Sequence, residues 1–195
     1  MLIFKIVFWA AIVAEMAIRA PISRKQRKEP KSEQRVSMQE KVLLGLLFLA
    51  MFFIPLIYST TNWLDFANYS LPLWAGWLGV ILIACSLIIF WLAHADLGLN
   101  WSPSLEIRTE HKLITNGIFG YIRHPMYASQ WVWVIAQSLL LQNWFAGPSN
   151  LLVFIFFYTL RVRAEEQMML DKFGDEYRKY MQTTGAIFPK GKLAK

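Results

Sequence analysis

Long apolar runs separated by short polar stretches extend along the whole chain. These runs occupy about residues 2–19, 42–59, 72–94, 126–144 and 149–164. A helix needs about 20 apolar residues to cross the hydrocarbon core of a bilayer. The pattern therefore predicts an all-α, multi-pass membrane bundle of about five transmembrane helices, of which the run 72–94 is the most apolar.

Three of the runs are weaker than the others. The first contains Lys5 and Glu15, although Arg19 follows Glu15 at the four-residue spacing that pairs opposite charges on a helix. The last two runs are short and are joined by QNWFAGPSN, which predicts a helical hairpin, tilted or only partly crossing. Gln130 and Gln137, seven residues apart, predict the inward side of the first hairpin helix.

The basic residues predict the orientation. Eight lysines and arginines lie between residues 19 and 41, three lie between 95 and 125, and eight follow from residue 161. The two facing loops hold only Asp65 as a charged residue. Because Lys and Arg of short loops stay in the cytoplasm, we expect the amino terminus outside and the carboxyl terminus inside. Tryptophans near the predicted outer ends are typical of a membrane interface: Trp63, Trp74, Trp77 and Trp144.

Composition agrees with a membrane protein and narrows the function. The chain has 195 residues, is 56% hydrophobic and contains nine tryptophans, which is more than a soluble core of this size needs. Its formal charge of +7 is spread over juxtamembrane segments, which fits anionic lipids rather than nucleic acid. One cysteine, Cys85, and three histidines leave little material for a metal site, so none is expected. The first nineteen residues lack a small-residue cleavage site, which predicts a retained membrane segment.

Polar residues gather in two segments, both on the predicted cytoplasmic side. The first ends in GYIRHPMY, where Pro125 suits the opening position of a helix. Free N–H groups at that helix start, with Arg123 and His124 beside them, favour an anion. The alternative is that Arg123 meets lipid headgroups and Pro125 only begins the helix. Upstream, Asn116-Gly117 predicts a turn. The turn either lets the backbone approach a ligand closely or is an ordinary loop turn.

The second segment, RVRAEEQMMLDKFGDEYRKYMQTTGAIFP, begins where the last run leaves the membrane. Two interpretations are open for Glu165 and Glu166. They pair with the arginines of this segment on the helix surface, or they accept hydrogen bonds from ribose hydroxyls and an adenine amine. Further along, Met169, Phe173 and Tyr177 form an apolar stripe broken at Gly174, which predicts an amphipathic cap lying against the site or against the membrane interface.

The run from LGLNWS through EHKLITNG to YIRHPMY, followed by RVRAEEQMMLDKFGDEYRKY, resembles the isoprenylcysteine carboxyl methyltransferase family and the related membrane phospholipid N-methyltransferases. The likeness covers about residues 97–189. It implies membrane helices with a basic loop in residues 1–94 and a catalytic region in residues 95–195. It also implies S-adenosylmethionine as the cofactor, S-adenosylhomocysteine as the product, and a prenylated cysteine as the methyl acceptor, entering from the bilayer.

Carried over to this sequence, the resemblance implies a set of cofactor contacts. They are His111, Leu113, Asn116, Gly117, His124, Pro125, Tyr127, Arg163, Glu165 and Glu166. Family members often have Pro-Tyr after the glycine, where this chain has Ile118-Phe119.

Three residues are expected at the reacting groups. Arg163 is expected to hold an acceptor carboxylate, because a guanidinium fits that group with two parallel hydrogen bonds. A carboxylate acceptor is already ionised and needs no base. An amine or thiol acceptor needs a proton removed, for which His124 and Glu166 are the candidates.

Other readings of the same residues remain open. A phospholipid N-methyltransferase, a sterol-type NADPH-dependent membrane reductase and a non-catalytic scaffold or transporter are the alternatives. The expected location is the plasma membrane of a prokaryote or the endoplasmic reticulum of a eukaryote.

Overall fold

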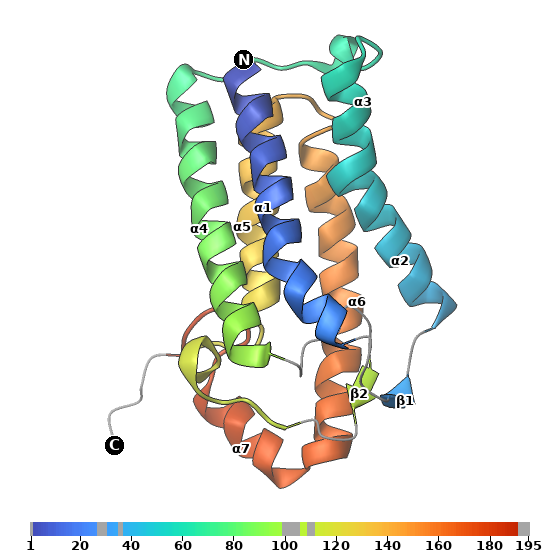
Figure 1. Cartoon of the computed structure of the whole chain (residues 1–195), viewed down its shortest axis with the longest axis vertical. Coiled ribbons are helices and arrows are strands. Elements are labelled where there is room, and N and C mark those ends of the chain that lie inside the picture. Colours follow the sequence, from blue (N-terminus) through green and yellow to red (C-terminus); the bar gives the residue numbers. More distant parts are fainter. Residues whose placement is uncertain (1, 27–30, 35–36, 99–105, 109–111, 191–195) are drawn as a thin grey trace.

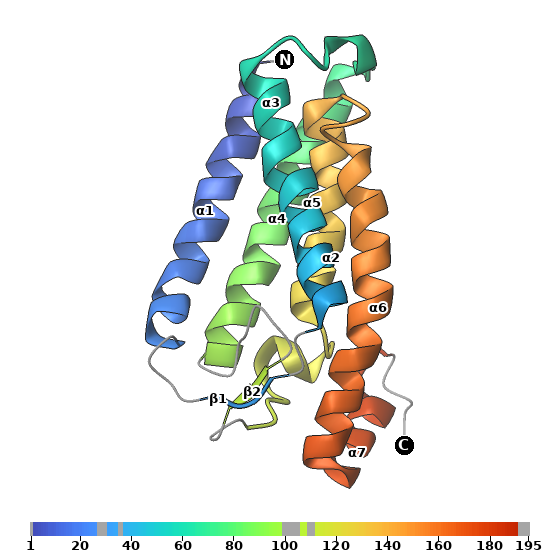
Figure 2. The same cartoon turned by 90° about the vertical axis from the view of Figure 1, so that its right-hand side faces the viewer.

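The protein is a bundle of long helices that run alternately in opposite directions. The computed structural model describes residues 2–26, 31–34, 37–98, 106–108 and 112–190. The described chain begins at one end of the bundle and ends near the other, where most of the shorter elements gather (Figures 1 and 2). The order of segments along the chain therefore matches the alternation that the sequence pattern predicts.

The helices confirm all five expected helical segments. They are α1 (Leu2–Gln26), α2 (Met38–Phe48) with η1 (Leu49–Phe53) and α3 (Ile54–Thr60) in one continuous rod, α4 (Leu73–Leu97), α5 (Pro125–Leu141) and α6 (Pro148–Phe173). Shorter helices are η2 (Asp65–Ala67), η4 (Gly117–Gly120) and α7 (Asp175–Thr183). Helices α5 and α6 form the expected hairpin, and α5 begins at Pro125.

The structure differs from the sequence pattern in three places. Helix α1 continues through Pro21 to Gln26, beyond the expected end at residue 19. Helix α6 continues past the predicted span to Phe173 and stops at Gly174, whose φ of +53° few other residues adopt. A short antiparallel pair, β1 (Lys31–Gln34) with β2 (Glu106–Arg108), adds two strands that no alternation in the sequence predicts.

Two of the described helical segments are long and apolar enough to cross a membrane. They are Met38–Thr60 and Leu73–Leu97. Large apolar side chains are also exposed on the outside of the bundle, among them Val13, Phe53, Ile81 and Phe156. An exposed apolar surface of this extent suits contact with lipid. The count of five crossings and the sidedness of the termini stay predictions.

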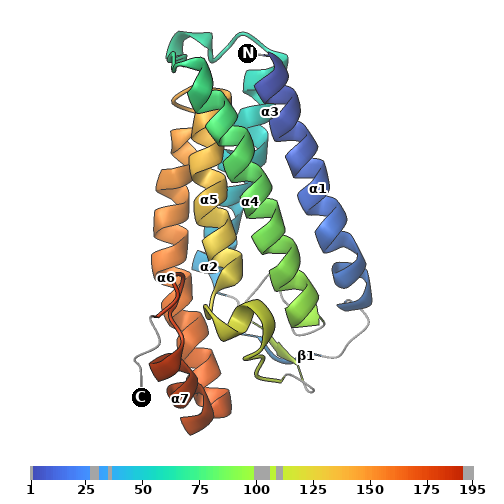
Figure 3. The same ribbon diagram turned by 90° about the vertical axis from the view of Figure 1, so that its left-hand side faces the viewer.

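Close contacts between helices build the core. A Cβ at Gly76 of α4 would lie 2.3 Å from the Phe4 ring of α1, and one at Gly79 would lie 3.0 Å from Leu140 of α5. Small residues of this kind let membrane helices approach closely. Figure 3 shows α4 crossing directly over α5, with α1 beside it.

A π-helical turn interrupts the α2–α3 rod. In η1 the N–H of Ile54 donates to the carbonyl of Leu49, five residues back. The carbonyl of Ala50 then faces Pro55, which has no N–H. Gln137 of α5 supplies the missing donor, since its Nε2 lies 3.1 Å from the Ala50 oxygen. Gln137 is fully buried, which confirms that its side of α5 faces the interior.

Candidate active site

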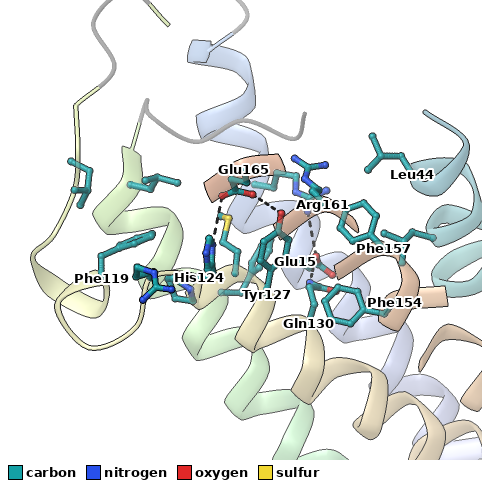
Figure 4. A pocket seen from close by; sticks show the side chains of 18 of the residues that line it. Glu15, Leu44, Phe119, His124, Tyr127, Gln130, Phe154, Phe157, Arg161 and Glu165 are labelled. Atoms are coloured by element: carbon teal, nitrogen blue, oxygen red, sulfur yellow. Dashed lines mark hydrogen bonds and ion pairs between the residues drawn. The ribbon is translucent and has the colours of Figure 1, made fainter. Parts of the chain in front are cut away.

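One cavity joins the polar end of the bundle to its apolar interior. Its volume is about 410 Å³, and its walls come from α1, the α2–α3 rod, the end of α4, the segment before α5, and α5, α6 and α7. The polar end contains Lys112, Arg123, His124, Arg161 and Glu165. The other end is lined by apolar side chains, including Leu44, Phe48, Met51, Phe52, Phe154 and Phe157. Figure 4 shows His124, Tyr127 and Glu165 grouped beside Arg161.

The segment before α5 is fixed to the end of the chain. The backbone N–H groups of Arg123 and His124 donate to the carbonyls of Gly185 and Ala186 at 2.8 and 2.9 Å. On α7, the hydroxyl of Tyr180 donates to the carbonyl of Phe119 at 2.5 Å. Tyr177, also on α7, is buried and lines the cavity. The amphipathic α7 therefore lies against the polar end, which is one of the two positions that the apolar stripe predicts. Met169 and Phe173 of that stripe belong to α6.

Arg123 joins three elements at this end. Its Nε and Nη2 donate to Glu166 Oε1 of α6 at 3.1 and 2.7 Å. Its Nη1 donates to the carbonyls of Met181 and Thr184 where α7 ends. The Arg123 side chain is only 8% exposed, so this is an internal connection and not a headgroup contact.

His124 lies between two carboxylates. Its Nε2 is 3.0 Å from Glu166 Oε1, and its Nδ1 is 3.7 Å from Glu165 Oε1. Tyr127, one turn into α5, donates its hydroxyl to Glu165 Oε2 at 2.5 Å. The two polar segments that the sequence separates by about 40 residues are thus brought together by direct side-chain contacts.

These contacts set the charges of the site. Burial alone lowers the pKa of His124, but Glu165 and Glu166 outweigh burial and raise it to about 9. Burial raises the pKa of Glu165, whereas His124, Arg161 and Tyr127 together lower it to about 2. The hydrogen bond from His124 is the main cause that lowers the pKa of Glu166. At neutral pH His124 is therefore an imidazolium between two carboxylates and is not a proton acceptor.

The arginine of α6 that reaches the cavity is Arg161. It is 8% exposed, and its Nη1 lies 3.1 Å from Oε1 of Glu40 in α2, which is also buried. Its guanidinium also lies 5.3 Å from the centre of the Phe157 ring. Arg163, expected to bind the acceptor, is exposed and is not among the lining residues. Two residues turn a helix by about 200°, so the face that presents Arg161 and Glu165 points Arg163 away.

The turn at Asn116-Gly117 packs against the end of α4. Gly117 has a φ of +57°, and a Cβ there would lie 2.0 Å from Asp96 Oδ2 at the end of α4. That same Asp96 oxygen accepts the N–H of Ile118 at 2.7 Å. Neither Asn116 nor Gly117 lines the cavity, whereas Leu113 does. The glycine thus has a packing role. His111 lies outside the described residues.

Two acidic groups behind the cavity wall, the buried Glu40 and the partly buried Asp96, carry no signal in the sequence pattern. Glu40 follows Ser37, whose side chain caps α2, and reads as an ordinary first-turn acid. Asp96 stands in the polar end of α4 with no neighbour that marks it. Both act on residues distant in sequence, Arg161 and Ile118, so only the fold identifies them.

The central part of the chain matches a family of known proteins. Residues 77–171 match the family model of the isoprenylcysteine carboxyl methyltransferase (ICMT) family. The chain belongs to the isoprenylcysteine carboxyl methyltransferase family. In this ICMT-family chain the matched stretch holds His124, Tyr127, Arg161, Glu165 and Glu166, whereas Glu15 and Glu40 precede it.

Curated relatives of the ICMT-family chain come from several eukaryotes. A protein-S-isoprenylcysteine O-methyltransferase of Dictyostelium discoideum is 29% identical over 119 residues, which are 58% of this chain and 48% of that protein. The protein of that name from Homo sapiens is 27% identical over 146 residues, 69% of this chain and 51% of the relative. The chain thus spans about half the length of these relatives.

A solved structure shares the fold. It is described as the eukaryotic intramembrane Ras methyltransferase ICMT, and it matches with a TM-score of 0.52 and 23% sequence identity. The match covers 80% of this chain and 54% of that one. Together with the two membrane-length helices, this likeness supports an integral membrane protein.

Proposed function

We propose that the protein transfers the methyl group of S-adenosylmethionine to the carboxylate of a prenylated cysteine or a similar lipid-linked acceptor at the membrane surface. The observation that carries this proposal is the single cavity that connects a charged end to an apolar interior. A hydrophilic donor and a greasy acceptor need such a space in order to meet away from water. The names of the curated relatives supply the reaction, since they are protein-S-isoprenylcysteine O-methyltransferases.

The residues at the charged end fit the cofactor. Helix α5 begins at Pro125 without a side-chain cap, so its first N–H groups suit the carboxylate of an amino-acid moiety. The Glu165 carboxylate, ionised at neutral pH, suits hydroxyl or amine groups. When bound, S-adenosylmethionine supplies a methyl group made electrophilic by its sulfonium. Cofactor contacts from Leu113, His124 and Tyr127 remain part of the proposal.

The protonation of His124 favours a carboxylate acceptor over an amine. An imidazolium bonded to Glu166 and Glu165 takes up no further proton at neutral pH. An amine or thiol must lose a proton as it is methylated, whereas a carboxylate does not. We assign the acceptor carboxylate to Arg161, which is held at the cavity wall by Glu40. The chain's own residues then orient the reactants and exclude water, and no base is needed.

The decisive experiment incubates the purified protein in detergent with methyl-labelled S-adenosylmethionine. The acceptors are a prenylcysteine, phosphatidylethanolamine and a small thiol, each in its own reaction. We expect base-labile label, a methyl ester, on the prenylcysteine. Label only on the amine would replace this proposal by phospholipid N-methylation.

A binding measurement separates the reductase alternative. S-adenosylhomocysteine is expected to raise the midpoint of thermal denaturation, because a ligand that binds only the folded state stabilises it. A rise with NADPH and none with S-adenosylhomocysteine would favour the sterol-type reductase.

A further inference from the structure

Glu15 is a carboxyl group in the cavity that the proposed reaction does not yet use. It lies in the middle of α1, is 7% exposed and lines the cavity together with Gln130. Gln130 donates its Nε2 to Glu15 Oε1 at 3.2 Å, and Arg19 Nη2 lies 3.6 Å from the same oxygen. Burying an ionisable group in an apolar helix is costly, and such groups mark functional sites by default.

The position of Glu15 complements that of Arg161. The two side chains come from α1 and α6, and Gln130 of α5 lies beside Glu15 in the same cavity (Figure 4). Gln130 stands one turn beyond Tyr127, whose hydroxyl reaches Glu165. The Glu15 carboxyl group therefore lies near the boundary between the charged end of the cavity and its apolar part, which begins at Phe154 and Phe157 (Figure 4).

We propose that Glu15 recognises the N–H group on the carbon that bears the acceptor's carboxylate. This inference rests on the proposed function. The last cysteine of a peptide carries its carboxylate and its amide N–H on one carbon, while the thioether chain leaves by the neighbouring carbon. Three features of the cavity match these groups. The Arg161 guanidinium suits the carboxylate, the Glu15 oxygen on α1 suits the N–H, and the apolar end of the cavity suits the thioether chain. Glu15 is thus a specificity-determining residue that distinguishes an amino-acid acceptor from a plain lipid acid.

A polar connection between α1 and α5 is the competing role for Glu15. In that role the Gln130–Glu15 contact only holds two helices together. Its loss would reduce the fraction of folded protein and lower the rate with every acceptor by the same factor. A ratio of rates measured with two acceptors on one preparation does not depend on the fraction folded, so it separates the two roles.

The test compares two acceptors that differ by one substituent. N-acetyl-S-farnesylcysteine carries the amide N–H, and S-farnesyl-3-mercaptopropionic acid has the same thioether and carboxylate without it. We expect the intact protein to prefer the first by about tenfold in kcat/KM, since a buried acceptor left without its donor costs about that factor. Glu15→Leu should bring the ratio close to one. Glu15→Gln keeps an acceptor oxygen, so its ratio should lie between that of the intact protein and that of Glu15→Leu.

A matched control lies on the same helix. Val13 is 64% exposed on the outside of α1, so Val13→Leu should keep the preference of the intact protein. An unchanged ratio in Glu15→Leu, with both acceptors still methylated, would overturn the role of Glu15 and leave methyl transfer intact. If the intact protein methylates neither acceptor, the proposed function fails, and the inference fails with it.

Discussion

Arg123 donates two hydrogen bonds to one oxygen of Glu166, from Nε at 3.1 Å and from Nη2 at 2.7 Å. This pair links the segment before α5 to α6, and the third nitrogen of the guanidinium holds the end of α7. The Arg123 guanidinium therefore adds several donors of fixed geometry to the backbone and Tyr180 hydrogen bonds that hold the polar end together.

Arg123→Lys should open that end although the charge is kept, because an ammonium does not form the same set of bonds in fixed geometry. We expect cleavage by a protease near Gly174 to become at least several-fold faster, and S-adenosylhomocysteine to bind about tenfold more weakly or worse. Arg178→Lys is the matched control, because Arg178 is exposed and pairs only on the surface with Asp175. Equal protease resistance in the two variants would show that Arg123 does not hold α7.

The pair of His124 with its two carboxylates predicts a pH dependence. The ordinary pKa of His124 is 6.5 and the folded value is about 9, so its contribution to stability is complete below pH 6.5 and is lost as pH rises through 9. The lowered pKa of Glu165, about 2, acts in the opposite range: its contribution is present above the ordinary value of 4.5 and is lost as pH falls through 2.

Thermal denaturation in detergent tests this dependence. The midpoint should fall between pH 6.5 and 9 in the intact protein. The fall should be smaller in His124→Gln, which keeps hydrogen bonding without titrating in that range. Methyl transfer should decline over the same range if the imidazolium is the active form. A His124→Gln profile with the same slope would assign the pH dependence to other groups.

The two arginines at the start of the second polar segment provide a direct comparison. Arg161→Lys should raise the acceptor's apparent KM at least tenfold, because the paired N–H donors are lost at the cavity wall, while cofactor binding changes little. Arg163→Met was expected from the sequence to have that effect. Since Arg163 is exposed and outside the cavity, we now expect it to change either constant less than twofold.

Steady-state kinetics with the prenylcysteine acceptor, together with direct measurement of S-adenosylhomocysteine binding, decides between the two arginines. A large rise in acceptor KM in Arg163→Met alone would restore the assignment made from the sequence.

Gly117 and Gly98 offer a second matched pair. Both have positive φ, +57° and +53°, a region that side chains other than glycine rarely adopt, so alanine at either position is strained. Only at Gly117 does a Cβ also meet Asp96, at 2.0 Å, whereas nothing lies within 4 Å at Gly98. We expect Gly117→Ala to lower the denaturation midpoint clearly more than Gly98→Ala and to weaken cofactor binding. Equal effects would mean that Asp96 moves aside without loss.

The sequence predicted most of the fold because the signals are local. Apolar run length gave the helices, Pro125 began α5 and Gly174 ended α6, each through a property of one residue or its neighbours. The meeting of His124 with Glu165 and Glu166 followed from placing both segments at one end of the bundle.

What the sequence could not predict depends on contacts between distant residues. The rotation of α6 decides that Arg161 and not Arg163 lines the cavity, and the Glu40 pair depends on how α2 meets α6. The two strands β1 and β2 form from short polar segments about 70 residues apart, which have no apolar alternation to reveal them.

The π-turn of η1 also fixes which side chains reach the cavity. It inserts one residue into the rod, so everything beyond it is rotated by about 100° relative to an uninterrupted α-helix. Phe48, just before this turn, and Met51, within it, line the cavity. Beyond the turn, Lys5 and Trp9 of α1 donate hydrogen bonds to the Tyr58 carbonyl and the Ser59 hydroxyl. Deleting a single residue here would leave the apolar composition of the rod almost unchanged and yet turn one half of its surface away from its partners. The identity of the cavity wall thus depends on the phase of a helix as much as on the residues it contains.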